Sequence, residues 1–512
     1  MKIINSFLAA VLLAGFSAGL PVRAYDTGPV NPDASPEAKA LLELYYRISG
    51  KYTLTGQHNY PNTRDRNTRF AANYIGQTPV IWSSDMGFAK DGDSDSYLAR
   101  PDIVKEAIRQ HKKGSIITLC WHAVPPTADE PVTFRPLPDA DPDSLASVQG
   151  RLTDRQFRDL LTPGTNLYKR WTVQVDSVAV YLKQLRDAGV PVLWRPYHEM
   201  NGDWFWWGGR TGEYSTADLY RQLFDRLVNY HHLNNLIWVW NVDRPSMPIR
   251  KFSNFYPGNQ YLDILSLDVY GSDFNQDYYD SLLALSQGKP ILLGEVGNPP
   301  MLPVLDKQPL WCSWVIWAGM VRNLTRNQHL ELVNDPRILS LEDPAYWEVT
   351  APYRKVCKLS PLPLKSSYPI NYSGHWRFNE GMSELGNRGS VNVPWELDVD
   401  HDNDMLHVTK LMIVEWSDDR ISHEDILLDG SEMTSTFFNS PRITTARWDK
   451  NCNCILIDSK VKFTRGDRNF ETETQERWRI EDGGKTLRIT RMSSGFRGGE
   501  NTGTWVYQKL DL

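Results

Sequence analysis

The chain has 512 residues, which is too long for one hydrophobic core and favours a large domain with a smaller one. Its formal net charge of -6 at pH 7 is modest and it lacks a long basic block, so we expect no nucleic-acid partner. The 19 Trp and 23 Tyr are more than packing needs, and because their rings stack on sugar faces they favour a carbohydrate ligand. An aromatic-rich core is the alternative for any single Trp.

The N-terminus has the pattern of a secretory signal peptide. A positive charge at Lys2 precedes an apolar run over residues 3–20, and a small-residue site ends at Ala24. We therefore expect residues 1–24 to be removed and the mature protein to be secreted or periplasmic. A membrane anchor is the alternative, but Pro21 and two glycines interrupt the run and no cysteine follows to carry a lipid. We expect no membrane partner.

Short apolar runs alternate with helical patterns over the next 300 residues, beginning with a helical pattern at residues 37–48. The predicted strands are residues 52–55, 79–83, 115–121, 190–196, 236–241, 264–270, 290–294 and 311–317. Because buried parallel strands are continuous apolar runs, these units predict an α/β fold, a (β/α)8 TIM barrel, as the catalytic domain over residues 25–360. A doubly wound open sheet is the alternative.

A long stretch over residues 122–165 has little periodicity and many Pro and Asp residues. It follows the third predicted strand, so we expect a long loop there. Loops at the carboxyl ends of barrel strands usually shape the active site. This loop is therefore predicted to border the site.

The composition changes near Pro361 and Pro363, which mark a linker. Residues 368–512 then show short alternating runs with turn signals between them, which predicts a small antiparallel β-barrel-like accessory domain with a loose resemblance to lipocalin-like barrels. The predicted strands are residues 375–378, 395–399, 405–409, 413–416, 434–438, 443–448, 455–461, 476–480, 486–490 and 504–509. For the six Trp of this region, core packing is favoured over a carbohydrate platform.

The five cysteines do not form a disulfide framework. Their number is odd, and neighbours such as Cys452 and Cys454 rarely bridge each other, so we expect the core to hold the fold. They also lack the spacing of zinc ligands, so we expect no metal and no other cofactor.

Two carboxylates end predicted strands of the barrel. Glu199 follows His198 at the end of the fourth strand, where a Trp-rich loop begins. Glu295 ends the seventh strand between glycines that allow close approach of neighbouring groups. Barrel enzymes keep their catalytic groups at these carboxyl ends. We therefore expect the two carboxylates to face each other across the mouth of the barrel.

Two carboxyl groups about 5 to 5.5 Å apart are what retaining cleavage of a glycosidic bond needs. Two like charges so close do not both ionise easily, so one group keeps a proton and becomes the general acid. Taken singly, Glu199 also fits a salt-bridge partner of Arg195, and Glu295 fits a carboxylate at a helix start. Together, and beside the tryptophans, they favour a catalytic pair.

At these residues the chain resembles glycoside hydrolase family 26 of the retaining (β/α)8 enzymes. The resemblance runs through most of residues 37–350 and is highly specific at R-P-x-H-E-x-N-G-x-W-F-W-W-G, residues 195–208. Many relatives in the wider clan place Asn before the acid/base, whereas family 26 places His there, as His198 stands here. The resemblance implies that Glu199 is the acid/base and Glu295 the nucleophile.

The resemblance also implies a set of substrate-binding residues. His198 would contact the sugar in the reacting subsite, Trp204 would wall the cleft, and Tyr270 would hydrogen-bond the nucleophile and hold it ionised. His122 matches a sugar-binding histidine, and Trp317 matches the aromatic platform under the reacting sugar.

Asp85 is a weaker match to the family pattern, for which a buried carboxylate that ties strands together is the alternative. The segment after Glu295, residues 298–310, is short and proline-rich, which leaves contacts to distant sugars and the choice of endo or exo action open.

The function implied is a monomeric, secreted endo-β-1,4-mannanase that acts on a β-mannan-type polysaccharide or oligosaccharide. A family 26 enzyme that cuts β-1,3-xylan or mixed-linkage β-glucan would keep the same pair of carboxylates and is the first alternative. A carbohydrate-binding protein without catalysis is the second, although such a protein has no physical need for two opposed carboxylates.

Overall fold

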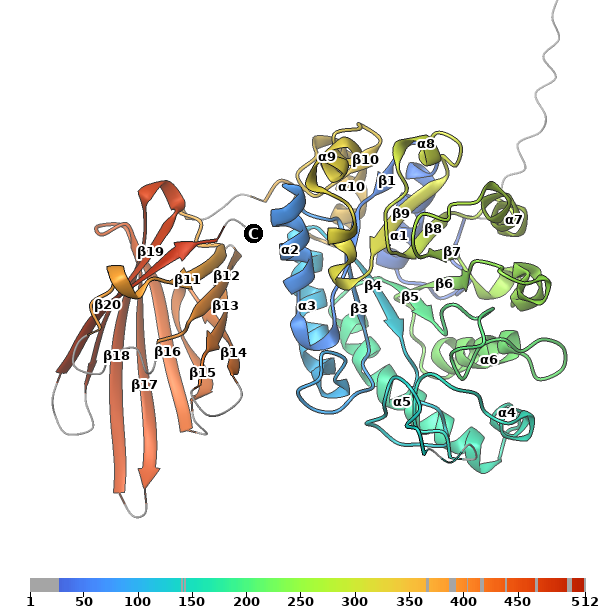
Figure 1. Cartoon of the computed structure of the whole chain (residues 1–512), viewed down its shortest axis with the longest axis horizontal. Helices are drawn as coiled ribbons and strands as arrows, with labels where there is room; N and C mark the ends of the chain where they lie inside the picture. Colours follow the sequence, from blue (N-terminus) through green and yellow to red (C-terminus); the bar gives the residue numbers. More distant parts are fainter. Residues whose placement is uncertain are drawn as a thin grey trace, which may run out of the picture.

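A computed structural model describes residues 27–139, 141, 144–364, 368–385, 393–402, 404–414, 419–437, 440–465, 468–494 and 500–510. Within them a parallel α/β barrel is followed by an antiparallel barrel-like sheet, and the two lie side by side (Figure 1). The expected signal peptide, residues 1–24, lies outside the described residues. Among the helices that the structure describes, none is long and apolar enough to span a membrane.

The parallel strands of the first domain close into a barrel. Its first strand is split into β1 (Thr53–Leu54) and β2 (Gly56–His58), and both parts pair with the last strand, β9 (Trp311–Ile316). Between them lie β3 (Ile81–Asp85), β4 (Ile116–Trp121), β5 (Val192–Pro196), β6 (Leu236–Asp243), β7 (Ile264–Val269) and β8 (Ile291–Val296). The pairing of β8 with β9 completes the closure, and β10 (Ile338–Leu339) adds to β1.

The predicted TIM barrel is therefore confirmed. Each of the apolar runs predicted as a strand overlaps an observed strand, and every residue of β1 to β9 is buried. Parallel strands covered on both faces are mostly apolar, which explains why their runs can be recognised in the sequence.

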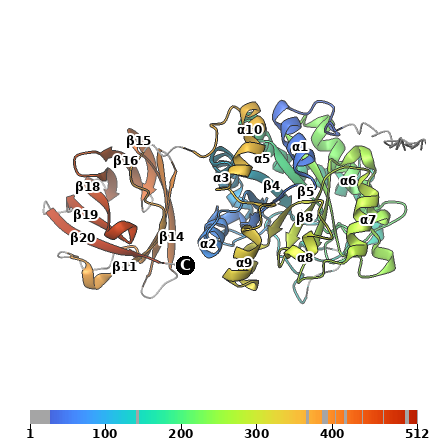
Figure 2. The same ribbon diagram turned by 90° about the horizontal axis from the view of Figure 1, so that it is seen from above.

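Helices surround the barrel, as Figure 2 shows from above. They are α1 (Pro36–Ile48), α2 (Arg66–Ile75), α3 (Arg100–Lys113), α4 (Asp154–Leu160), α5 (Asn166–Asp187), α6 (Thr216–Phe224), α7 (Gln276–Ser286), α8 (Leu302–Leu305), α9 (Arg326–Val333) and α10 (Pro344–Val356). Several begin at side-chain caps: the Thr165 hydroxyl accepts from Tyr168 N before α5, and Ser215 and Asp218 form a capping box at α6. The long loop after β4 contains α4 near its end.

Helix α6 continues as a π-helical turn, η3 (Asp225–Tyr230). The other short helical turns are 3-10 turns: η1 (Pro61–Thr63), η2 (Tyr97–Ala99), η4 (Pro248–Arg250), η5 (Phe252–Phe255), η6 (Asn259–Tyr261), η7 (Ala318–Asn323), η8 (Glu380–Met382) and η10 (Asp482–Gly484).

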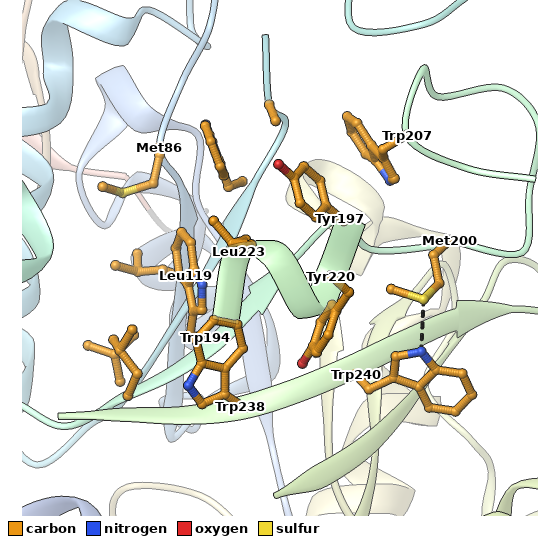
Figure 3. Close-up of a cluster of buried hydrophobic side chains, with 14 of the residues drawn as sticks. Met86, Leu119, Trp194, Tyr197, Met200, Trp207, Tyr220, Leu223, Trp238 and Trp240 are labelled. Atoms are coloured by element: carbon orange, nitrogen blue, oxygen red, sulfur yellow. Dashed lines mark hydrogen bonds between the residues drawn. The ribbon is translucent and has the colours of Figure 1, made fainter. Parts of the chain in front are cut away.

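A buried aromatic cluster supports the loop that follows β5 (Figure 3). Trp240 of β6 donates its indole N–H to Met200 Sδ, and Trp171 of α5 donates to the Tyr197 hydroxyl at 2.9 Å. Trp207 donates to the backbone oxygen of His198 at 2.9 Å. These indole rings are buried, and buried Trp N–H groups usually find a partner of this kind. Much of the aromatic excess of the barrel is therefore core that fixes this loop.

The second domain is an antiparallel sheet in the order β14-β13-β12-β11-β20-β19-β18-β17-β16-β15. Its strands are β11 (Gly374–Phe378), β12 (Glu396–Asp402), β13 (Met405–Met412), β14 (Arg420–Leu427), β15 (Asp429–Phe437), β16 (Ser440–Asp449), β17 (Cys454–Arg465), β18 (Arg468–Glu481), β19 (Thr486–Ser494) and β20 (Glu500–Lys509). The end strands β14 and β15 lie against each other, so the sheet forms a nearly closed barrel. The predicted antiparallel barrel-like domain is confirmed, whereas its likeness to lipocalins stays a prediction.

One of the strands predicted in this domain is wrong. Residues 413–416 were expected to be a strand, but Ile413 and Val414 lie outside the strands and residues 415 and 416 are outside the described part of the chain. The strand is β14, which begins seven residues later. Because its residues are mostly polar and its first half is exposed, it lacks the apolar alternation that marks a half-buried strand.

The expectation that Cys452 and Cys454 do not bridge is also wrong, because the structure joins them in a disulfide. Cys452 lies in the turn after β16 and Cys454 is the first residue of β17, where it pairs with Asp449 as the chain reverses. The reversal brings their Cα atoms to 5.3 Å, within the usual range for a disulfide. Cys120, Cys312 and Cys357 are free thiols.

A cluster of ion pairs joins the two domains. Arg109 and Lys113 of α3 both bind Asp400 of β12, with Lys113 Nζ 2.9 Å from Asp400 Oδ2. Arg69 of α2 binds Asp398 of the same strand. Burial alone would raise the pKa of Asp400, but the charges of Lys113, Arg109 and Arg69 hold it well below its usual value.

Candidate active site

The carboxylates of Glu199 and Glu295 lie together at the carboxyl end of the barrel. Glu295 is in β8 and Glu199 follows β5 by three residues. One oxygen from each of Glu199, Glu295 and Asp268 lies within 4.8 Å of the others. Glu199 is 8% exposed and Glu295 is 3% exposed. The structure thus brings together the two carboxylates that the sequence predicted as a pair, at a spacing close to the retaining one.

Glu295 has a donor on each carboxylate oxygen. Arg195 Nη2 donates to Oε1 at 2.5 Å and the Tyr270 hydroxyl donates to Oε2 at 2.5 Å. His198 Nε2 lies 3.7 Å from Oε1. Charge-assisted hydrogen bonds of this length fix the orientation of a carboxylate. The Glu295 side chain is therefore held in one orientation by Arg195 and Tyr270.

Gly294 makes room for this arrangement. A Cβ at that position would lie 2.4 Å from Ser266 Oγ and 2.7 Å from Asp268 Oδ1. These atoms belong to the neighbouring strand β7, so a side chain would push apart the strands that carry the site. The close approach expected from the flanking glycines is thus present at Gly294.

Glu199 is held differently. The Trp204 indole donates to Oε2 at 2.6 Å, and the backbone N–H of Glu199 donates to Asn241 Oδ1 at 2.7 Å. Its φ of 50° lies in the left-handed region, where a residue with a side chain is strained and persists only if its surroundings fix it. Burial first, and the charge of Glu295 second, raise the pKa of Glu199 well above its usual value. Glu199 is therefore the carboxyl that keeps a proton.

Arg195 is not the partner of Glu199, which was one alternative for that residue. Its guanidinium binds Glu295 and also Asp268 Oδ2, at 3.0 Å. Asn241 donates to Asp268 Oδ1 at 2.7 Å. The sequence reasoning did not assign Asp268 or Asn241 to the site. Each is a polar residue inside a mostly apolar strand, and this pattern could have identified them. A buried polar side chain must find a hydrogen-bond partner, so such residues tend to lie next to other polar groups.

Two histidines stand beside the carboxylates. His122 follows β4, and its Nδ1 lies 3.0 Å from Asp85 Oδ2, which also accepts the His122 backbone N–H at 2.9 Å. Burial opposes the charged form of His122, but the charge of Asp85 outweighs it and raises the pKa. Burial lowers the pKa of His198 well below its usual value, so that imidazole is neutral. The rings stand edge to face with centroids 4.4 Å apart.

Asp85 lies behind His122. It is 1% exposed and also accepts from the Gly87 backbone N–H at 2.7 Å. Its contacts join β3 to the end of β4. They match the alternative given for Asp85, a buried carboxylate that ties strands together, better than they match contact with substrate.

Trp317 follows β9 and is half-buried, with one face on His58 at a centroid distance of 3.8 Å and an interplanar angle of 11°. Burial lowers the pKa of His58 to about 3, so a neutral ring backs the indole. Tyr60 stands edge-on to the same indole. The sequence reasoning missed His58 and Tyr60. They lie at and just beyond the end of the first strand, and such a position at a strand end is what identified the other site residues.

A pocket of about 530 Å³ opens beside Glu199, Trp204 and Tyr270. Its remaining walls are mostly charged or polar, which suits a ligand rich in hydroxyl groups. Those walls are made by Gln149, Asp243, Arg244, Ser246, Arg250, Asp273 and Tyr278. Gln149 comes from the long loop after β4, which was expected to border the site. The guanidinium of Arg250 lies 5.2 Å from the Trp204 ring.

Two groups of described side chains have donor atoms close enough to hold a metal ion. In the first, Asp85 already accepts from His122 and Cys120. In the second, the guanidinium of Arg195 already neutralises two of the three carboxylates, Asp268 and Glu295. Both groups are thus satisfied by protein donors, and neither requires a cation.

Comparison with known proteins gives one family. The family described as glycosyl hydrolase family 26 matches residues 30–340. Mannan endo-1,4-beta-mannosidase of Thermothelomyces thermophilus is 33% identical over 319 residues, which cover 60% of this chain and 60% of that protein. The enzyme of the same name from Bacillus subtilis strain 168 is 30% identical over 317 residues, 57% of this chain and 79% of that protein.

Solved structures agree with this match. GH26A from Muricauda sp. is 41% identical, with a TM-score of 0.55, and the alignment covers 61% of this chain and 98% of that one. The GH26-CBM35 beta-(1,4)-mannanase of Podospora anserina is 29% identical, with a TM-score of 0.53 and coverage of 66% and 72%. The chain spans 60% or less of the length of the first three curated relatives that it matches.

Proposed function

Because this chain belongs to glycosyl hydrolase family 26, we propose that it is a retaining endo-β-1,4-mannanase that hydrolyses mannan, glucomannan or galactomannan backbones. One observation carries the proposal: two buried carboxylates lie with oxygens within 4.8 Å of each other, and their surroundings differ. Glu295 pairs with the Arg195 guanidinium and accepts from the Tyr270 hydroxyl, whereas burial and the charge of Glu295 raise the pKa of Glu199 well above its usual value. Such a difference divides a nucleophile from a general acid.

The reaction is a double displacement. The Glu295 carboxylate attacks the anomeric carbon and forms a covalent glycosyl-enzyme, while Glu199 gives its proton to the leaving glycosidic oxygen. Glu199, now a carboxylate, takes a proton from a water molecule that attacks the same carbon. The bond to Glu295 breaks and the sugar leaves with its original β configuration. No cofactor enters this scheme.

The surrounding side chains would orient the sugar. His122 and His198 supply ring nitrogens beside the carboxylates, and Trp204 and Trp317 supply aromatic walls for the apolar faces of the sugar. The contacts of Asp85 favour a positioning role through His122. Tyr270 is a positioning residue for Glu295 as well as part of the pocket wall.

The preferred backbone is tested by product analysis. Purified protein is incubated with mannan, glucomannan, β-1,3-xylan and mixed-linkage β-glucan, and the oligosaccharides released are identified. We expect β-1,4-linked manno-oligosaccharides of several lengths as the first products. Products from β-1,3-xylan or mixed-linkage glucan alone would establish the alternative substrates, since the same carboxylates serve those backbones. Release of single sugars only would contradict endo action.

A carbohydrate-binding protein without catalysis is the alternative from another class. It predicts that the protein binds mannan yet releases no reducing ends at any enzyme concentration. The relatives named as mannan endo-1,4-beta-mannosidases support the catalytic proposal, as does the difference between Glu199 and Glu295.

We also propose that the protein is secreted or periplasmic and acts as a monomer. The first part rests on the charge and apolar run of residues 1–24, and N-terminal sequencing of the mature protein from its native host tests it. The expected new N-terminus is Tyr25. Light scattering on the purified protein measures the mass and tests the second part.

A further inference from the structure

The antiparallel domain encloses a cavity of about 520 Å³. Small-molecule sites in proteins have volumes of about 300 to 1,000 Å³, so this cavity is of functional size. It lies within one domain, away from the carboxylates of the α/β barrel, and its walls are side chains of the antiparallel strands together with Leu385, Val393 and Pro394.

The cavity arises because the inward-facing side chains change character halfway along the strands. On β19, Leu487 and Ile489 are buried in the apolar core, whereas Arg491 and Ser493, next in the same inward row, line the cavity. On β18 the same row passes from Trp478 in the core to Glu476, Thr474 and Thr472 in the cavity. One end of the sheet is therefore a packed core and the other is hollow, where hydroxyl and charged side chains stand among apolar ones such as Phe437 and Phe463.

The cavity carries charges that packing alone does not require. Glu424 of β14 binds both Lys410 Nζ at 2.7 Å and Arg442 Nη1 at 2.8 Å, although its side chain is only 10% exposed. Apolar residues of similar volume usually stabilise a fold as well as buried ion pairs do. These side chains therefore give a polar ligand charged groups to contact inside the cavity.

An aromatic ring stands among these polar groups. The guanidinium of Arg491 lies 5.3 Å from the ring of Trp505 on the neighbouring strand β20, and Arg491 Nη2 donates to Thr474 Oγ1 at 3.3 Å. Eight of the 24 residues that line the cavity are serines or threonines, whose side chains carry hydroxyl groups. Hydroxyl, guanidinium and carboxylate groups around one indole match a ring molecule that has polar edges and an apolar face.

We propose that this cavity is a second carbohydrate-binding site, which takes a sugar of one or two rings against Trp505 with Arg491 as a hydrogen-bond donor. A lipid fits the cavity poorly, because its chain would leave Glu424, Lys410 and Arg442 desolvated beside methylene groups. Binding at this site does not require hydrolysis, so its test is independent of the proposed activity.

Methyl NMR tests the proposal in the whole protein. The chain is labelled with methyl-¹³C methionine in a Glu295→Ala background, so that added sugars stay intact. Met412 lines the cavity and Met200 lies in the core of the catalytic domain, so their resonances, assigned by Met412→Leu and Met200→Leu, report the two regions separately. Mannobiose, cellobiose and xylobiose are titrated in turn, with palmitate as the apolar probe.

We expect at least one of these sugars to shift the Met412 resonance with a saturable curve. Arg491→Ala should raise the apparent Kd about tenfold or more, because it removes a charged hydrogen-bond donor. The matched control is Arg488→Ala on the same strand, since Arg488 faces outward and binds Glu481 instead of the cavity. If Arg491→Ala disturbs the fold, Thr474→Val replaces it, because this change removes a cavity hydroxyl and keeps the side-chain shape.

Hydrolysis of the preferred polysaccharide should be unchanged by Arg491→Ala in the otherwise unaltered chain, because the cavity lies in the other domain. The proposal is overturned if no sugar in the panel moves Met412, or if Arg491→Ala and Arg488→Ala bind alike. It is also overturned if only palmitate moves the resonance, because the cavity would then be a lipid site.

Discussion

The Tyr270 hydroxyl donates to Glu295 Oε2 at 2.5 Å, on the opposite side of the carboxylate from Arg195. Tyr270 directly follows β7 and Glu295 lies in β8, so the contact bridges two neighbouring strands at the mouth of the barrel. Burial raises the pKa of Tyr270 well above its usual value, as does the charge of Glu295, so the phenol stays protonated and remains a donor. The contact therefore constrains the orientation of the proposed nucleophile.

Tyr270→Phe should lower kcat by about 10- to 100-fold, because the carboxylate loses one of the two donors that hold it in the attack geometry. KM should change by less, since the aromatic wall remains. Steady-state kinetics on an aryl β-mannobioside measures both. Tyr278→Phe, on the wall of the same pocket, is the matched control and should keep more than half of kcat. Equal loss in the two variants would mean that the Tyr270 hydroxyl acts only through packing.

Glu295→Ala should lower kcat by several orders of magnitude, because it removes the group that forms the covalent intermediate. The fold should persist, since Arg195 keeps its second partner, Asp268. Hydrolysis assays and thermal unfolding of the same preparation measure the two effects. Glu213→Ala at an exposed position is the control, with normal activity. A folded Glu295→Ala protein that keeps more than about a tenth of the activity would refute the assignment.

The barrel and its carboxylate pair are predictable from sequence for a local reason. A strand covered on both faces is a continuous apolar run, and a polar residue at its end projects into the mouth of the barrel, so Glu199 and Glu295 are visible without coordinates. The contacts made by Asp268 and Asn241 are different. They depend on the register of β6 against β7 and on side-chain directions, which the sequence does not contain.

The antiparallel domain shows the same limit. Strand β14 was missed because its polar residues face solvent and the cavity, so its pattern does not differ from that of a loop. The Cys452–Cys454 bond depends on how tightly the turn after β16 reverses. The change from apolar core to polar cavity along β18 and β19 becomes apparent only once the inward row of each strand is known.

The pKa of Glu199 should depend on Glu295. Because burial and the neighbouring charge raise this pKa, Glu199 stays protonated to higher pH than an ordinary Glu, and kcat/KM should fall as pH rises through its pKa. Glu295→Gln removes the charge, so Glu199 should lose its proton at lower pH. Carboxyl ¹³C NMR of labelled glutamate follows this titration directly. Asp243→Asn, which removes a weaker contribution, should shift the titration less, and an unchanged titration in Glu295→Gln would contradict the coupling.

The stereochemistry of the product follows from the spacing of the two carboxylates. An oxygen of each carboxylate lies within 4.8 Å of the other, which is nearer to the separation of about 5 to 5.5 Å in retaining enzymes than to the separation of about 6.5 to 9.5 Å in inverting enzymes. The first product released should therefore have the β configuration. Proton NMR in the first minutes of hydrolysis, before mutarotation, distinguishes the anomers. An α-anomer formed first would rule out double displacement.

The two carboxylates should fail in different ways when each is removed, since protonation matters most for a poor leaving group. A sugar hydroxyl has a high pKa and needs the acid, whereas an activated aryl group hardly does. Glu199→Ala should therefore lose most activity on polysaccharide but keep much of its first-step rate on an aryl β-mannobioside. Glycosyl-enzyme should then accumulate on Glu295, and mass spectrometry of the intact protein detects it.

Added azide should restore turnover of Glu199→Ala, because a small anion attacks the intermediate from the β face without a general base and fits the space left by the carboxylate. Glu199→Gln is the matched control, since it keeps the volume next to Trp204 and should be rescued less. Glu295→Ala should show neither the covalent intermediate nor a β-azide product, because it cannot form the bond that azide displaces. If Glu199→Ala instead loses equal rate on both kinds of leaving group and azide has no effect, Glu199 is not the acid/base, and the division of roles between the two carboxylates is wrong.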